Sequence, residues 1–146
     1  MERVKIDLPE IFQFTTEVTV RVSDVNYGGH LGNDSILSLV HEARLRFLKN
    51  LGFSESNIAG TGIIMFDAAI QYKSQAYHGD ILVLDIAVEN FIRSGCDFLF
   101  KITNKLTGKE IARAKTGIAF FDYEKNKMVP VPEKFKAIVL NLSEQK

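Results

Sequence analysis

Several stretches of the chain alternate between apolar and polar residues, at the two-residue period of a strand with one buried face. The first stretch begins at Glu17 and places Val18, Val20 and Val22 on one side. β-Branched residues at alternate positions are typical of a half-buried strand. We therefore expect a strand here that ends at the paired glycines beginning with Gly28.

A helical period follows this strand. Between Asp34 and Asn50, apolar residues recur every three or four positions and cover more than a narrow stripe. A helix with so broad an apolar surface is largely enclosed by the rest of the fold. Asn33, Asp34 and Ser35 are all residue types that cap helix N-termini, and Gly52 is placed to cap the C-terminus. The pattern predicts one long, covered helix.

The second half of the chain returns to strand patterns. The connections between the expected strands are short and contain Gly or Asn, so the strands should be antiparallel neighbours. The expected strands are Gly62–Tyr72, with Ile64, Phe66, Ala68, Ile70 and Tyr72 on one face; Ile81–Phe91; a segment marked by Phe98, Phe100 and Ile102; and Ile111–Asp122. One long helix against five strands is an α+β layout, in which the sheet must curl around the helix.

The two ends of the chain carry weaker patterns. We expect residues 1–10 to form an arm or a short edge segment. Pro130 and Pro132 break the last hairpin, and we expect residues 133–146 to be a short tail with one helical turn. Since no internal repeat or linker interrupts the sequence, we expect a single domain over residues 1–146, with its core at about residues 15–125.

Length and charge exclude some classes of function. The chain has 146 residues, and its 18 Lys and Arg residues balance its 18 Asp and Glu residues. A neutral chain does not predict the basic surface that nucleic acids require. No apolar run is long enough to span a bilayer, and the N-terminus has no signal-peptide pattern. We therefore expect a cytoplasmic protein with no nucleic-acid partner and no membrane span.

Cys96 is the one cysteine in the sequence, which excludes an intramolecular disulfide. No histidine lies near it in the sequence, so we interpret it as a packed small residue rather than a nucleophile.

The stretch from Ser23 to Asp34 carries the residues best suited to chemistry. It places a carboxylate (Asp24), an amide (Asn26) and an imidazole (His30) within seven residues, beside two glycines that let the backbone turn sharply. The helix that follows offers free N–H groups at its start, which can bind an oxyanion. Such a set of groups suits acyl chemistry, in which a directed water attacks a carbonyl carbon.

Each of these residues also has a structural interpretation. Asp24 and Asn26 are residue types that close turns through hydrogen bonds to their own backbone. His30 can be a buried histidine bonded to a carbonyl, and Asn33 can be a helix cap as well as an oxyanion donor. The histidines are too scattered in sequence to predict a metal site, and neither a Gly-x-Ser-x-Gly elbow nor a Walker-type loop occurs.

Two blocks of the sequence match a known pattern. Residues 24–33 read Asp-Val-Asn-Tyr-Gly-Gly-His-Leu-Gly-Asn, against a family pattern Asp-x-Asp/Asn-x-x-Gly-His-x-x-Asn, and residues 42–44 add Glu-Ala-Arg. Residues 72–80 resemble a strand-to-strand crossing that ends Ala-x-x-Gly-Asp, although Pro is common where Gln75 stands. The chain thus resembles the hotdog-fold acyl thioesterases of the 4-hydroxybenzoyl-CoA thioesterase-like superfamily over about residues 15–125. The resemblance implies a curved five-stranded antiparallel sheet wrapped around one long helix.

One position departs from that family. Many members carry a catalytic Asp where this chain has Asn26, and an amide cannot act as a base. The combination is similar to plant acyl-ACP thioesterases, although their histidine follows the Asn by two residues, whereas His30 follows by four. By this similarity, His30 is the candidate general base. Asn26 would position the water or the thioester, Asp24 would orient a partner or close the loop, and the backbone N–H of Asn33 would donate to the oxyanion.

The resemblance also implies partners and excludes cofactors. It implies an acyl-CoA or acyl-ACP thioesterase without a metal or other cofactor, in which the CoA or ACP moiety enters as part of the substrate. It further implies a homodimer with sheets joined edge to edge and sites at the interface, and it is compatible with a homotetramer. Two alternatives stay open: a hotdog protein that binds acyl-CoA without hydrolysing it, and a hotdog dehydratase or hydratase.

Other polar residues are expected to lie outside the catalytic site. Glu42 and Arg44 are expected to be structural or dimer contacts, His41 an interface or surface residue, and His78 a solvated turn residue. Basic residues that could bind CoA phosphates are available but cannot be ranked from sequence: Arg93, Lys105, Lys109 and Arg113.

Overall fold

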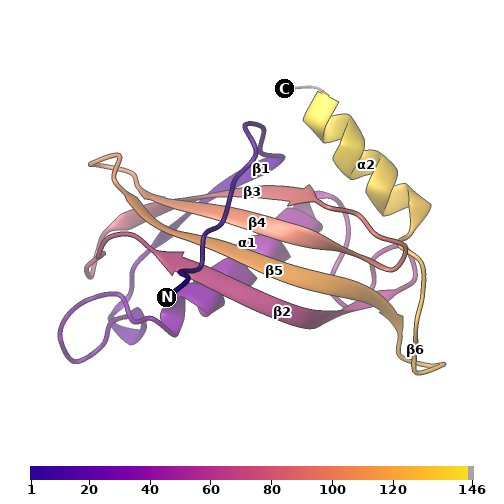
Figure 1. The fold of residues 1–146 in the computed structure, drawn as a ribbon, viewed down its shortest axis with the longest axis horizontal. Helices are drawn as coiled ribbons and strands as arrows, with labels where there is room; N and C mark the ends of the chain where they lie inside the picture. The colour runs from indigo at the N-terminus through magenta and orange to yellow at the C-terminus, as the bar shows by residue number, and fades with distance from the viewer. Residues whose placement is uncertain (145–146) are drawn as a thin grey trace.

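The computed structural model describes residues 1–144 and consists of one antiparallel sheet with two helices (Figure 1). The elements are β1 (Phe14–Thr19), a 3-10 turn (Val22–Asp24), α1 (Ser35–Asn50), β2 (Gly62–Tyr72), β3 (Ile81–Glu89), β4 (Gly95–Asn104), β5 (Glu110–Asp122), β6 (Lys127–Met128) and α2 (Glu133–Glu144). The strands are ordered β1-β3-β4-β5-β2, and the short β6 pairs with β5. The expected layout, a curved sheet of five long strands against one long helix, is confirmed.

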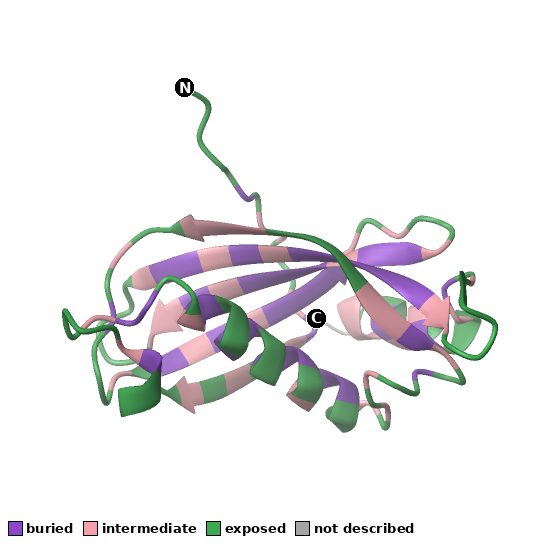
Figure 2. Ribbon diagram, turned by 90° about the horizontal axis from the view of Figure 1, so that it is seen from below, coloured by how far each residue is buried: buried purple, intermediate pink, exposed green. Residues whose placement is uncertain are grey.

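The core lies between α1 and the face of the sheet that it covers. Buried residues run along the central strands and one side of α1, while the opposite side of α1 is exposed (Figure 2). Aromatic rings dominate this layer: Phe47 of α1 packs edge-on against Phe98 of β4, with ring centroids 6.3 Å apart. Phe98 and Phe100 are fully buried, so they fill the core.

The first strand is displaced toward the N-terminus relative to the prediction. β1 ends at Thr19, well before the glycine turn, and Val22 is 75% exposed rather than on the buried face. The carboxylate of Asp24 accepts a hydrogen bond from the backbone N–H of Arg21 at 2.8 Å, which draws the chain between them into the 3-10 turn. The strand prediction was wrong here because a side chain interrupts an otherwise regular alternation.

The two ends of α1 differ in how well the sequence predicted them. At the C-terminus, Gly52 adopts φ +87°, its N–H bonds to the carbonyl of Lys49, and the N–H of Phe53 bonds to that of Leu48. This is a Schellman motif, and it confirms the predicted glycine cap. At the N-terminus no side chain caps the helix, and the cap position, Asp34, is itself helical in conformation. The predicted side-chain cap was therefore wrong.

A β-bulge at Phe66 breaks the predicted single face of β2. The pairing with β5 shifts register between Met65 and Asp67. As a result, Ile63 rather than Ile64 packs against the core on one side of the bulge, and Ile70 does so on the other. Phe66 itself is 56% exposed. An extra residue in one strand reverses the two faces beyond it, which a uniform alternation cannot anticipate.

The C-terminal segment is a three-turn helix rather than the expected single turn. In α2, Phe135 and Val139 stand four residues apart and are both fully buried. Leu142 adds a third apolar position on the same side. The helix forms because this stripe closes one end of the core. The last two residues of the predicted tail lie outside the described residues.

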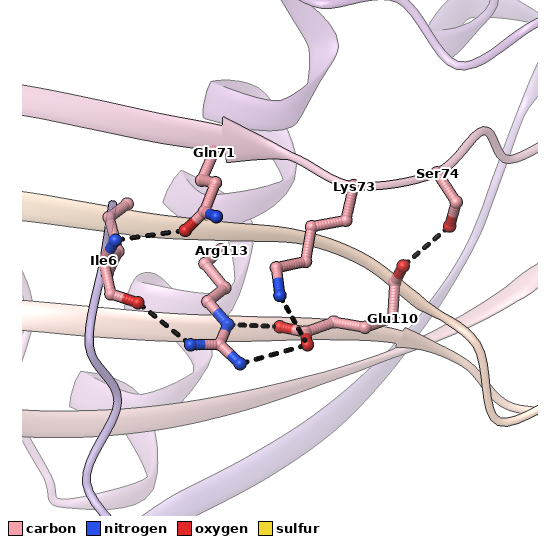
Figure 3. A network of polar contacts seen from close by, with 6 residues as sticks. All are labelled: Ile6, Gln71, Lys73, Ser74, Glu110 and Arg113. Atoms are coloured by element: carbon pink, nitrogen blue, oxygen red, sulfur yellow. Dashed lines mark hydrogen bonds and ion pairs between the residues drawn. The ribbon is translucent and has the colours of Figure 1, made fainter. Parts of the chain in front are cut away.

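The N-terminal segment is an arm that crosses the face of the sheet opposite α1 (Figure 1). Ile6 is buried there against Ala87 and Leu99 of the central strands. The arm is fastened by two hydrogen bonds of 3.0 Å: the N–H of Ile6 donates to Gln71, and Arg113 donates to the carbonyl of Ile6 (Figure 3). It does not extend the sheet as an edge strand.

Within residues 1–144, none of the helices combines the length and the apolar character of a membrane span.

Candidate active site

The loop between β1 and α1 folds back on itself and packs against the connection between β2 and β3. Val25 and Leu31 pair as an antiparallel bridge, and His30 pairs with Tyr77. The N–H of Leu31 donates to the carbonyl of Ala76 at 2.8 Å. The structure therefore brings together the two sequence blocks that carried the family resemblance.

Asp24 is a structural residue of this loop. Its carboxylate is buried and bound by the backbone and the guanidinium of Arg21. Its carbonyl accepts the N–H of Gly32 at 2.9 Å, which closes the loop. Burial acts to raise the pKa of Asp24, but the hydrogen bonds and positive charge of Arg21 outweigh it, so the pKa lies below its ordinary value.

Asp24→Asn is expected to lower stability in a pH-dependent way. Because the folded pKa of Asp24 lies below the unfolded value of about 4, its ionised form stabilises the fold above that pH and stops doing so as the pH falls through the folded pKa. The variant should have a lower free energy of unfolding than the wild type at pH 7, and a smaller deficit at pH 3. Urea unfolding at both pH values measures this. Asp34→Asn, at an exposed position, is the control, and an equal deficit at both pH values would contradict the account.

Asn26 shapes the loop through its side chain. Its Oδ1 accepts the N–H of Gly28 at 2.9 Å and that of His30 at 3.3 Å. The turn interpretation of Asn26 is thus correct for the carbonyl oxygen of the amide. The NH₂ group of the amide is not used in these bonds, so Asn26 can still donate to a ligand.

A cavity of about 310 Å³ lies where this loop meets the start of α1, the end of β2 and the start of β5. Its lining includes Asn26, His30 and Asn33, but not Asp24. Its other lining residues are Leu31, Ile36, Tyr72, Lys73, Ser74, Gln75, Ala76 and Ile111. Sequence reasoning assigned no role to the polar residues from Tyr72 to Gln75, although they stand in the second family block.

His30 is the one imidazole on this cavity within the described chain. Its ring packs edge-on against Tyr77, with centroids 5.1 Å apart. Across residues 1–144 its ring nitrogens make no hydrogen bond, so the buried, carbonyl-bonded histidine weighed as an alternative is not what the structure contains. A half-buried imidazole with free nitrogens can bind a water and take its proton.

Two residues at the N-terminal end of α1, Asn33 and Ile36, line the same cavity. The carbonyl of Asn33 accepts the hydroxyl of Tyr72 at 3.1 Å, which fixes the chain just before the helix. Within the described residues, the backbone N–H of Asn33 has no acceptor. Unpaired N–H groups and the positive end of the helix dipole both favour an anion at this place. The cavity therefore combines a candidate base with a candidate oxyanion donor.

A family model described as the thioesterase-like superfamily matches residues 20–139. The chain belongs to this superfamily. No curated protein sequence matches the chain.

Solved structures share the fold of this thioesterase-like chain. A 1,4-dihydroxy-2-naphthoyl-CoA thioesterase from Synechocystis is 22% identical, with a TM-score of 0.81 over 88% of this chain and 96% of that one. A thioesterase-superfamily protein from Jannaschia sp. CCS1 is 17% identical, with a TM-score of 0.82 over 93% of this chain and 86% of that one. At such identities the likeness establishes the hotdog fold and nothing about the substrate.

The Glu-Ala-Arg residues of α1 and the neighbouring His41 lie outside the lining of the candidate cavity of this thioesterase-like chain. Glu42 pairs with Arg46 at 2.8 Å, and Arg44 is buried and pairs with Glu55 at 2.7 Å. His41 also contacts Glu55, and none of these side chains lines the cavity. They are structural contacts within the described chain.

Cys96 is buried in the core. Burial, with a smaller effect from the neighbouring Asp97, raises the pKa of the Cys96 thiol to about 12, so it is a packed thiol rather than a nucleophile. Among the described residues, no three His, Cys, Asp or Glu side chains converge in a way that could hold a metal ion.

Proposed function

We propose that this protein hydrolyses acyl thioesters of CoA or of ACP. Membership of the thioesterase-like superfamily supports hydrolysis of acyl thioesters in general. The observation that carries the proposal for this chain is one cavity that joins the imidazole of His30 to the N–H of Asn33, both without a hydrogen-bond partner within residues 1–144. Those are the two groups that water-driven acyl transfer needs.

In the proposed reaction, His30 takes a proton from a water molecule, and the oxygen of that water forms a bond to the carbonyl carbon of the thioester. The carbonyl oxygen becomes an oxyanion and accepts a hydrogen bond from the N–H of Asn33. Collapse of this intermediate breaks the C–S bond, and the leaving thiolate takes the proton from His30. The products are a carboxylic acid and a free thiol, and no metal or other cofactor enters the reaction.

Asn26 has two tasks in this proposal. Its Oδ1 holds the loop that presents His30, and its NH₂ group orients the water or the thioester. Asp24 closes the loop through its carbonyl, which accepts the N–H of Gly32. It does not line the cavity and does not contact the substrate.

We also propose a homodimer joined through β2. This strand is one edge of the sheet, and Met65 and Phe66 on it are exposed. An exposed apolar edge strand is a surface that a second strand can cover. The candidate cavity lies at the end of β2, at Tyr72, so the partner subunit would border it. Light scattering coupled to size-exclusion chromatography measures the oligomeric state, and a tetramer would be an assembly of two such dimers.

We also expect the protein to be cytoplasmic.

Tyr72→Phe is expected to lower kcat by roughly tenfold with little change in KM, because it removes the hydroxyl that fixes the Asn33 carbonyl beside the oxyanion donor. Tyr123→Phe is the matched control: it removes a hydroxyl bonded to the carbonyl of Ile63, at the other end of the same strand. Steady-state kinetics on one acyl-CoA compares them. Equal effects of the two variants would contradict a specific role for Tyr72.

A protein that binds acyl-CoA without hydrolysing it is the second candidate, because Asn26 stands where a carboxylate base is usual in the family. Incubation with a panel of acyl-CoAs separates the two functions. Release of free CoA supports the hydrolase. Saturable binding of acyl-CoA without release supports the second candidate, and loss of absorbance from an enoyl thioester would instead indicate a hydratase.

A further inference from the structure

A second cavity continues from the candidate site along the surface. It has a volume of about 540 Å³ and shares Lys73, Ser74, Gln75 and Ile111 with the first cavity. From there it runs between the connection from β2 to β3 and the turn from β4 to β5. We call this surface the lysine groove, after the two lysines in its lining, Lys73 and Lys109.

Three polar side chains of the lysine groove, those of Asn104, Thr107 and Gln75, accept hydrogen bonds from the protein. Oδ1 of Asn104 accepts the N–H groups of two residues in its own turn, at 3.0 and 3.2 Å. Oγ1 of Thr107 accepts the N–H of Lys109 at 3.2 Å, and Oε1 of Gln75 accepts the hydroxyl of Tyr77 at 3.3 Å. These side chains keep donors for a ligand: two amide NH₂ groups and one hydroxyl.

The charges in the groove favour the same kind of ligand. Lys109 is exposed and makes no ion pair within residues 1–144. Lys73 lies 3.4 Å from Glu110, a carboxylate that it shares with Arg113 (Figure 3). Among the described residues, Asp80 is the one carboxylate in the lining, and it accepts a hydrogen bond from the N–H of Tyr77 at 2.9 Å. A groove with two ammonium groups and spare donors suits an anion rich in acceptors.

The structure distinguishes the basic residues that the sequence could not rank as phosphate ligands. Arg113 is bound by Glu110 and by the carbonyl of Ile6. Lys105 pairs with Glu17 at 2.8 Å, and neither Lys105 nor Arg93 lines the groove. Lys109 is the sequence candidate that lies in the groove, and Lys73 is a second lysine that sequence reasoning did not propose.

We propose that the lysine groove binds a phosphate of the carrier part of the thioester, with Lys109 and Lys73 as its cationic ligands. This inference rests on the proposed function, because the groove opens from the cavity where the thioester would react. Phosphate is chemistry that CoA and the phosphopantetheine arm of ACP share. The acyl group would occupy the first cavity and the phosphorylated arm would leave along the groove.

The test is calorimetric titration of the full chain with free CoA and with pantetheine, which lacks phosphate. Lys109→Ala should weaken CoA binding roughly fivefold and leave pantetheine binding unchanged. Lys109→Arg should keep most of the affinity, since it keeps the charge. Lys105→Ala is the matched control outside the groove and should change neither titration.

Titration with 4′-phosphopantetheine distinguishes the sources of phosphate. A loss with Lys109→Ala for both CoA and 4′-phosphopantetheine assigns the groove to the arm that CoA and ACP share, and a loss for CoA alone assigns it to the nucleotide phosphates; either supports the proposal. Unchanged CoA binding, or an equal loss for pantetheine, overturns it. Because free CoA is not hydrolysed, a failure of thioester hydrolysis would refute the proposed function without changing this readout.

Discussion

Replacing His30 with alanine is expected to lower kcat for acyl-thioester hydrolysis by about 100- to 10,000-fold. His30 is the imidazole on the cavity, its ring nitrogens are free of protein partners within the described chain, and it lines the same cavity as Asn33. Among the described residues, no carboxylate and no second imidazole lines the cavity to take a proton from water. Steady-state release of free thiol from an acyl-CoA measures the loss.

Two comparisons make this result specific to the site. His78→Ala removes an exposed histidine from the turn before β3, and it should leave kcat unchanged. His30→Ala should unfold at nearly the same temperature as the wild type, because its ring is only partly buried and makes one aromatic contact. Wild-type turnover by His30→Ala would remove this histidine from the mechanism.

Phe135→Ala is expected to lower the free energy of unfolding by about 3–5 kcal/mol. Phe135 is fully buried. Its ring lies 5.5–6.5 Å from four other aromatic rings, so truncation leaves a cavity that rigid neighbours cannot fill. Those rings come from four different segments of the chain: Phe53, Phe91, Phe98 and Phe120. Urea unfolding followed by circular dichroism measures the change.

Leu140→Ala provides the matched control in the same helix. Leu140 is 46% exposed, so its truncation should cost less than about 1 kcal/mol. If Phe135→Ala were equally mild, α2 would not close the core as the structure indicates. The candidate cavity lies away from this aromatic cluster, and folded Phe135→Ala should therefore keep its turnover.

The fold was predictable where one periodicity runs through an element without interruption. Leu82 to Val88 in β3 and Ala112 to Phe120 in β5 alternate as expected and face the core. The errors arose where a single local interaction overrides the period. The carboxylate of Asp24 ends β1 early, and the bulge at Phe66 reverses the faces of β2. Neither the early end of β1 nor the bulge in β2 changes the alternation of apolar and polar residues in the sequence.

The C-terminal helix was missed for a different reason. Its apolar stripe is short, and two prolines precede it, so the segment reads as a tail. The contacts that make it a helix join Phe135 to rings as far away in sequence as Phe53. Such tertiary packing stabilises short helices that local propensity leaves undecided.

The site was predictable in part, because its loop is local in sequence. Asn26, His30 and Asn33 meet on one cavity, as expected, whereas Asp24 lies behind the loop. Tyr72 and Lys73 could be found only once the pairing of His30 with Tyr77 had joined the loop to the second block. Which polar residues surround a reactive loop depends on how distant segments meet.

The central claim is that this chain hydrolyses acyl thioesters with His30 as base. The most direct measurement is simultaneous detection of free thiol and free carboxylic acid from a panel of acyl-CoAs, running from short branched to long-chain to aromatic, with acyl-ACP included. We expect equal amounts of both products from at least one substrate with wild-type protein, and almost none with His30→Ala. No release from any CoA or ACP thioester, or release that His30→Ala leaves intact, would contradict it.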